Sequence, residues 1–152
     1  MDESIRKQLE KPQTWFCKYF PKRIQNVGEK EITDRQLVYD FKDGRSHEVV
    51  AQMTAARMIE EHGNRCSQLV FIPVPASSVR KNEIRYMNFC KRVCELTGAI
   101  NGYDHVRVCG ERLAIHENRM AEKEIRKVSI IEFDEEWFRG KAVIVFDDVI
   151  TR

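Results

Sequence analysis

The sequence has no long hydrophobic run, no internal repeat and little net charge. No apolar stretch approaches the roughly 18 residues that a membrane-spanning helix needs, so no transmembrane segment is predicted. Residues 1–13 contain no apolar core, and we therefore expect no signal peptide. The net charge of +2 is too small to indicate a nucleic-acid-binding protein by itself.

Cysteines and histidines do not form a zinc-binding pattern. The five cysteines include no Cys-x-x-Cys, and no His-x-x-x-His occurs, so a zinc site is not expected. Cys90 and Cys94 are four residues apart in a helical pattern, where reduced thiols most simply fill a core. We expect a cytoplasmic protein.

What is present indicates one globular domain of α/β type. A hydrophobic content of 42% in 152 residues is enough for a substantial core. Ser46 is placed to cap a helix with apolar positions between Val49 and Ile59 that ends at Gly63. A second helix is expected from Asn82 or Glu83 to Gly98, with a buried stripe formed by Tyr86, Phe89, Cys90, Val93 and Leu96.

Strands are predicted between and after these helices. Residues 68–74 form a continuous apolar stretch, which is typical of a buried parallel strand. Residues 105–109, 128–133 and 141–146 are further strand candidates, and the last one is rich in β-branched residues and is expected to be buried. Strands that alternate with helices favour a parallel, Rossmann-like sheet.

Two adjacent carboxylates, Asp147 and Asp148, follow the last predicted strand. Ligands of open α/β sheets bind beyond the carboxyl ends of the strands. Ionised carboxylates can accept hydrogen bonds from sugar hydroxyls or bind a divalent cation. Neighbouring strand residues point in opposite directions, so one acid can face a ligand while the other orients the backbone. A solvated pair without a ligand remains the alternative.

A loop of small residues follows the strand at 68–74. Its sequence, Pro-Val-Pro-Ala-Ser-Ser, lets backbone N–H groups approach an anion closely. Ser77 and Ser78 add hydroxyl donors, and Arg80 adds a bidentate fork for phosphate. This chemistry suits pyrophosphate, although an ordinary strand-to-helix turn has a similar sequence.

Two further segments are rich in cations. Residues 110–127 carry Arg119 and Lys123, which could close over a polyphosphate as a lid, or simply form a solvated face. Near the N-terminus, Trp15, Phe16 and Tyr19 lie among basic residues and could stack on single-stranded nucleic acid. The simpler expectation is that the aromatic and basic segment 1–36 packs on the core.

In this order, the motifs resemble those of the type I phosphoribosyltransferases, and most closely the ComF family of competence proteins, which also resembles the amidophosphoribosyltransferases. The resemblance covers roughly residues 37–152, starting at Leu37 to Lys42. Pro73-Val74-Pro75 matches the family's strand end, and Arg85 and Asn88 match part of its Arg-Gly-Phe-Asn-Gln helix start. Asp147-Asp148-Val149-Ile150-Thr151 matches its signature, with Arg152 where a second Thr is expected.

The resemblance implies a reaction between phosphoribosyl pyrophosphate and a nitrogen nucleophile, with Mg²⁺ as cofactor. Asp147 and Asp148 would hold the ribose hydroxyls and meet Mg²⁺, directly or through water. Ser77, Ser78 and Arg80 would bind pyrophosphate, Arg119 or Lys123 would close over it, and Thr151 would begin the loop for the 5′-phosphate.

Two departures from the family pattern qualify this expectation. The family's N-terminal cysteine segment is replaced by residues 1–36, and the sequence stops before the Gly-x-Thr/Ser part of the phosphate loop. We therefore expect a sheet that is incomplete at its C-terminal side, and either a fragment, or a chain completed by a partner or by self-association. The alternatives to an enzyme are a non-catalytic ComF-like module in DNA uptake or processing, and a single-stranded nucleic-acid-binding module.

Overall fold

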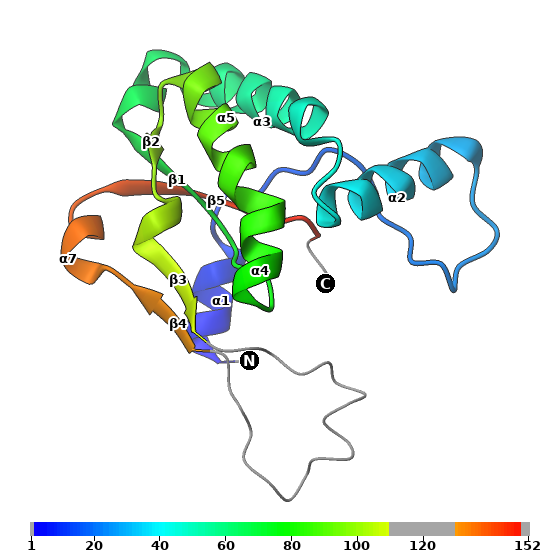
Figure 1. The fold of residues 1–152 in the computed structure, drawn as a ribbon, viewed down its shortest axis with the longest axis horizontal. Coiled ribbons are helices and arrows are strands. Elements are labelled where there is room, and N and C mark those ends of the chain that lie inside the picture. The colour runs from blue at the N-terminus through cyan, green and yellow to red at the C-terminus, as the bar shows by residue number, and fades with distance from the viewer. Residues whose placement is uncertain (1, 110–129, 150–152) are drawn as a thin grey trace, which may run out of the picture.

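The computed structural model describes residues 2–109 and 130–149. Within them, three parallel strands form a sheet with the order β2-β1-β5 (Figure 1). The central strand β1, Leu69–Pro73, lies between β2, Ile100–Asn101, and β5, Ala142–Phe146. The α/β fold with a parallel sheet that the alternation of strands and helices predicted is thus confirmed at this level.

The other two strands form a separate antiparallel pair. β3, Val106–Cys109, pairs with β4, Ile130–Phe133, and both lie within segments that were predicted as strands. Their antiparallel pairing was not anticipated, and neither strand belongs to the parallel sheet.

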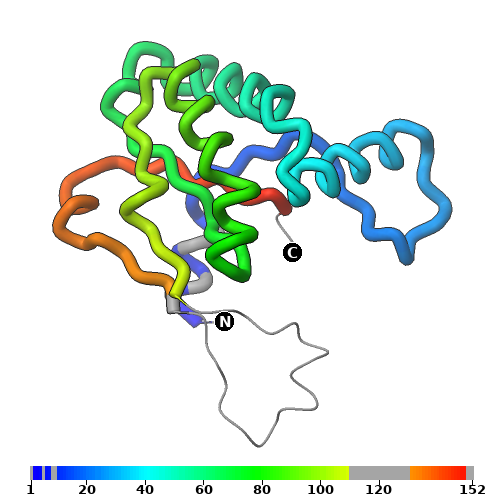
Figure 2. Tube along the Cα trace, viewed as in Figure 1, coloured from blue at the N-terminus to red at the C-terminus, as the bar shows by residue number. Residues whose placement is uncertain are grey.

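Most of the helical elements precede or separate the strands along the described chain. Figure 2 follows the N-terminal segment past the sheet before the chain enters α2. No helix among residues 2–109 and 130–149 is long and apolar enough to cross a bilayer. The helical elements are α1 Glu3–Leu9, α2 Glu29–Lys42, α3 His47–His62, η1 Gly63–Gln68, α4 Val79–Asn82, η2 Glu83–Met87, α5 Asn88–Thr97, η3 Tyr103–His105 and α7 Glu135–Phe138.

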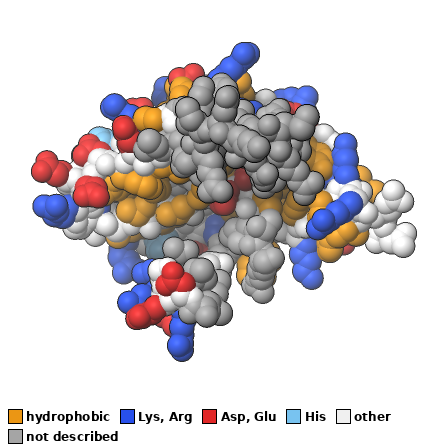
Figure 3. All heavy atoms as spheres, turned by 90° about the horizontal axis from the view of Figure 1, so that it is seen from below, with side chains coloured by type: hydrophobic (Ala, Val, Ile, Leu, Met, Phe, Trp, Pro, Cys, Tyr) orange, Lys and Arg blue, Asp and Glu red, His pale blue; other side chains and the backbone are white. Residues whose placement is uncertain are grey.

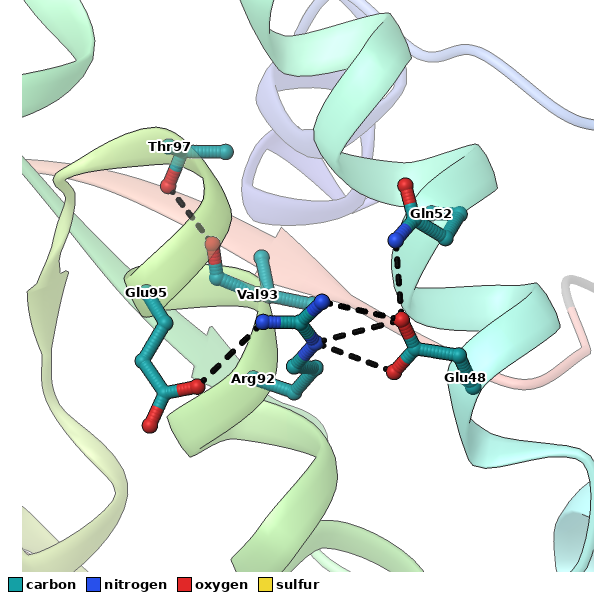
Figure 4. A network of polar contacts seen from close by, with 6 residues as sticks. All are labelled: Glu48, Gln52, Arg92, Val93, Glu95 and Thr97. Atoms are coloured by element: carbon teal, nitrogen blue, oxygen red, sulfur yellow. Dashed lines mark hydrogen bonds and ion pairs between the residues drawn. The ribbon is translucent and has the colours of Figure 1, made fainter.

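One face of the sheet packs against helices and carries the main core. Phe71 of β1 and Phe146 of β5 meet Phe89 of α5, and the ring centroids of Phe89 and Phe146 are 4.7 Å apart. At the surface, the guanidinium of Arg92 on α5 forks onto the carboxylate of Glu48 on α3 with N–O distances of 3.0–3.2 Å (Figure 4). This contact ties together the two helices that cover this face.

The opposite face is covered only in part by the described residues. Val70 and Ile72 of β1 are buried against Val106 and α7, whereas Val143 and Val145 of β5 are 38% and 58% exposed. The prediction that the last strand is buried was therefore wrong for one of its faces. Hydrophobic side chains gather at the surface on the α7 side in Figure 3. A hollow of about 480 Å³ between α7 and β5 is lined by residues that include Ile72, Phe138 and Val143.

Both predicted helices form, with corrections to their details. Ser46 precedes α3, but its backbone is left-handed with φ of 57° and its side chain makes no capping hydrogen bond. Val49 and Ile59 are exposed because the buried face of α3 instead runs through Val50, Ala51, Thr54, Ala55 and Met58. The second helix begins at Val79 rather than at Asn82 or Glu83, since Ser78 supplies its cap.

Candidate functional site

The loop after β1 and the acid pair after β5 leave the sheet side by side. β1 and β5 are parallel neighbours, and Pro73 pairs with Phe146 at their carboxyl ends. The N–H of Val74 donates to the carbonyl oxygen of Phe146 at 2.7 Å. The two segments that the sequence singled out for ligand binding are thus brought together at one edge, as expected for an α/β site.

A buried asparagine holds the loop after β1. The Oδ1 atom of Asn82 accepts a hydrogen bond of 2.9 Å from the N–H of Ala76, and both residues are buried. In the sequence, Asn82 is indicated only as a possible helix start. The spacing of six residues from Ala76 to Asn82 is not a recognisable motif in the sequence, because this hydrogen bond forms only once the loop folds back over α4.

The hydroxyl groups of the loop lie at the start of α4. The Ser78 Oγ accepts a hydrogen bond of 3.2 Å from the N–H of Lys81, which caps the helix. The Lys81 Nζ donates to the Ser77 Oγ at 3.5 Å, and Arg80 is exposed. An accepting Ser78 hydroxyl keeps its own O–H free to donate, so the cap is compatible with the predicted contact to an anion.

Asp148 is held inside the protein by two cations. Its Oδ2 atom is buried, with the Arg85 Nη1 at 3.3 Å and the Lys42 Nζ at 3.5 Å. The side chains of Asp148 and Arg85 are only 11% and 15% exposed. Neither cation meets hydrogen-bond geometry with this oxygen, so the contacts are ion pairs.

Asp147 differs from its neighbour in its exposure. It is exposed, yet surrounding protein atoms remove part of the hydration of its carboxyl group. This desolvation, together with the adjacent Asp148, raises the pKa of Asp147 to about 6. The prediction that the two acids would have different surroundings agrees with this geometry.

A π turn places the guanidinium of Arg85. Residues Glu83–Met87 form η2, which interrupts the helix between α4 and α5. Such turns often occur at functional sites. From this turn, the Arg85 Nε donates to the carbonyl oxygen of Lys42 at 3.3 Å, and the guanidinium carbon lies 5.7 Å from the ring centroid of Tyr86. Lys42 and Arg85 were noticed in the sequence only as points of resemblance, not as site residues.

A cavity of about 1020 Å³ opens beside the acid pair. The N-terminal segment forms one wall, and α2, α3 and β5 form the others. The Tyr19 and Tyr39 hydroxyls are 3.4 Å apart and connect the segment to α2, whereas Trp15 is 60% exposed. Part of the aromatic cluster thus contacts α2, and part remains at the surface.

The donor set is compatible with a magnesium ion that a ligand carries. Among the described residues, no three His, Cys, Asp or Glu side chains gather to hold a metal. Mg²⁺ commonly binds to one or two carboxylates together with phosphates of a substrate. Asp147 fits that role, because Asp148 is already paired with Lys42 and Arg85. Arg119, Lys123 and Thr151 lie outside the described residues.

Comparison with known proteins found no match among protein-family models, curated proteins or solved structures. The description of the protein therefore rests on its own fold and site. It is an α/β protein whose parallel sheet brings a Pro-Val-Pro loop and an acid pair to one edge.

Proposed function

We propose that the protein binds phosphoribosyl pyrophosphate together with Mg²⁺ and transfers the phosphoribosyl group to a nitrogen nucleophile in the cytoplasm. The observation that carries this proposal is the hydrogen bond between Val74 and Phe146 across the carboxyl ends of β1 and β5. It places a loop suited to pyrophosphate beside carboxylates suited to a sugar diol. The resemblance to the type I phosphoribosyltransferases supports the same assignment.

Two segments of the described residues would contact different parts of the ligand. Ser77, Ser78 and Arg80 would contact the pyrophosphate from the loop after β1, and the acid pair would lie on the ribose side. In the reaction, the bond from the anomeric carbon to pyrophosphate breaks as the bond to nitrogen forms. Positive charge then develops on the ribose, which an ionised carboxylate nearby favours. Bound Mg²⁺ would neutralise part of the charge on the leaving pyrophosphate.

Calorimetric titration with phosphoribosyl pyrophosphate and Mg²⁺ tests the binding step. We expect Asp147→Asn to weaken the affinity by about 10- to 100-fold, since a hydrogen bond to a charged group contributes roughly 1.5–3 kcal/mol. Asp104→Asn is the matched control, because Asp104 is an exposed aspartate on η3. Absence of binding to the unsubstituted protein would contradict the proposal.

Release of pyrophosphate separates an enzyme from a non-catalytic ComF-like module. An enzyme releases pyrophosphate when candidate nitrogen nucleophiles are supplied with Mg²⁺ and phosphoribosyl pyrophosphate. A non-catalytic member of the same fold binds the ligand and releases none.

The exposure of Trp15 favours a second candidate function, binding of single-stranded nucleic acid. Its indole is 60% exposed, and the nearby Lys18 and Arg23 are exposed as well. Such binding would weaken steeply with added salt and would be lost in Trp15→Ala. Binding that does not depend on salt, or no binding, would rule it out.

A further inference from the structure

Three elements that are distant in the sequence converge on the carboxylate of Asp148. Lys42 ends α2, Arg85 lies in the π turn η2, and Asp148 follows β5. The Arg85 Nε also donates to the carbonyl oxygen of Lys42 at the carboxyl end of α2. A cation is favourable there, because the last carbonyl groups of a helix carry partial negative charge.

Close packing of the loop after α2 keeps these groups in reach of one another. Gly44 has φ of 81°, and a Cβ atom there would lie 3.0 Å from the carbonyl oxygen of Ile84 and 2.6 Å from its Cγ2. Only glycine allows this backbone to lie directly against η2. The approach brings the end of α2 beside the turn that carries Arg85.

We propose that Arg85 and Lys42 are positioning residues, which anchor Asp148 inside the protein so that Asp147 is the carboxylate that meets the ligand. The carboxylate of Asp148 is already paired with the two cations, and its Oδ2 atom is buried. Asp147 and Asp148 both line the cavity beside β5, but only Asp147 is exposed. The part of this inference that concerns the ligand, a magnesium-bound sugar diphosphate, rests on the proposed function.

A double-mutant cycle without ligand tests the anchor. Arg85→Met, Asp148→Asn and the combination are unfolded in urea. Because each single substitution breaks the same ion pair, the loss in the combination should be smaller than the sum of the single losses, by about tenfold in the unfolding constant. Lys91→Met is the matched control, since Lys91 is an exposed cation on α5. An additive result for Arg85 and Asp148 overturns the anchor.

Titration with phosphoribosyl pyrophosphate and Mg²⁺ tests the division of roles. Arg85→Met should weaken binding about tenfold while Lys91→Met does not, Arg85→Lys should recover part of the loss, and Asp148→Asn should add little to Arg85→Met. Asp148→Asn alone should cost less affinity than Asp147→Asn, because asparagine has nearly the same shape and its side-chain oxygen can accept a hydrogen bond from a neighbouring cation, so the side chain can keep its place.

The two proposals fail in different ways. If Asp148→Asn costs as much affinity as Asp147→Asn, Asp148 meets the ligand directly and the division of roles is wrong. If Arg85→Met costs no affinity, Arg85 is not a positioning residue. If the unsubstituted protein binds no phosphoribosyl pyrophosphate, the proposed function and the division of roles both fail, and the unfolding cycle alone decides the anchor.

Discussion

Removing the side chain of Asn82 should loosen the loop that the proposed function assigns to pyrophosphate. Asn82 is 6% exposed, and its Oδ1 accepts the hydrogen bond of 2.9 Å from the N–H of Ala76. Asn82→Ala leaves this buried N–H without a partner, at a cost of about 1–3 kcal/mol. Alanine is also a better helix former than asparagine, which returns about 0.5 kcal/mol. The net loss expected is therefore about 0.5–2.5 kcal/mol.

Asn88→Ala is the matched control for this experiment. Asn88 is exposed and begins α5, so its substitution reports the change in helix propensity without a buried hydrogen bond. Urea unfolding of both variants, compared at equal slope, gives the difference directly. Asn82→Ala should also weaken binding of phosphoribosyl pyrophosphate more than Asn88→Ala does. If Asn82→Ala is as stable as Asn88→Ala, this hydrogen bond does not hold the loop.

Three further predictions follow from burial and charge. Phe89→Ala should lower the free energy of unfolding by about 3–5 kcal/mol in urea, because Phe89 is fully buried, whereas Phe133→Ala, at 57% exposure, should change it far less; equal losses would contradict the assigned core. Binding of phosphoribosyl pyrophosphate should weaken as the pH falls through about 6, where Asp147 takes up its proton, and calorimetry of Asp147→Asn should show a flatter pH profile. The hydrogen bond from His105 lowers the pKa of Asp134 in the folded protein. The ionised carboxylate therefore stabilises the fold above the pKa that Asp134 has in the unfolded chain, and this contribution is lost as the pH falls through the lower pKa of the folded protein. The melting temperatures of the unsubstituted protein and Asp134→Asn should converge below about pH 4, and a difference that stays constant with pH would refute this.

Local sequence patterns were sufficient for the elements that carry the site. The apolar run at Leu69–Pro73 and the β-branched run at Ala142–Phe146 predicted the two strands, and parallel pairing then brings their carboxyl ends together. The stripe with Phe89 and Val93 predicted the buried face of α5. These features depend on the order of residues along one element, which a single sequence shows.

Contacts between distant elements could not be obtained in this way. No residue next to Lys42 or Arg85 in the sequence indicates that both side chains meet the carboxylate of Asp148. Likewise, the residues of β5 are apolar on both faces, so the pattern does not distinguish the covered Ile144 and Phe146 from the exposed Val143 and Val145. Each of these facts depends on which element lies opposite, and periodicity within one segment does not contain that information.

The π turn also sets which way the side chains point along the continuous helix formed by α4, η2 and α5. Each residue advances an α-helix by about 100°, so the wider turn at Glu83–Met87 rotates everything that follows relative to α4. Arg85 forms an ion pair with Asp148, while Tyr86 and Phe89 are buried in the core. Deleting one residue from this turn would restore a regular helix, yet it would bring either the cation or the aromatic rings out of alignment. A shorter, more regular helix would thus be compatible with the core or with the site, but not with both.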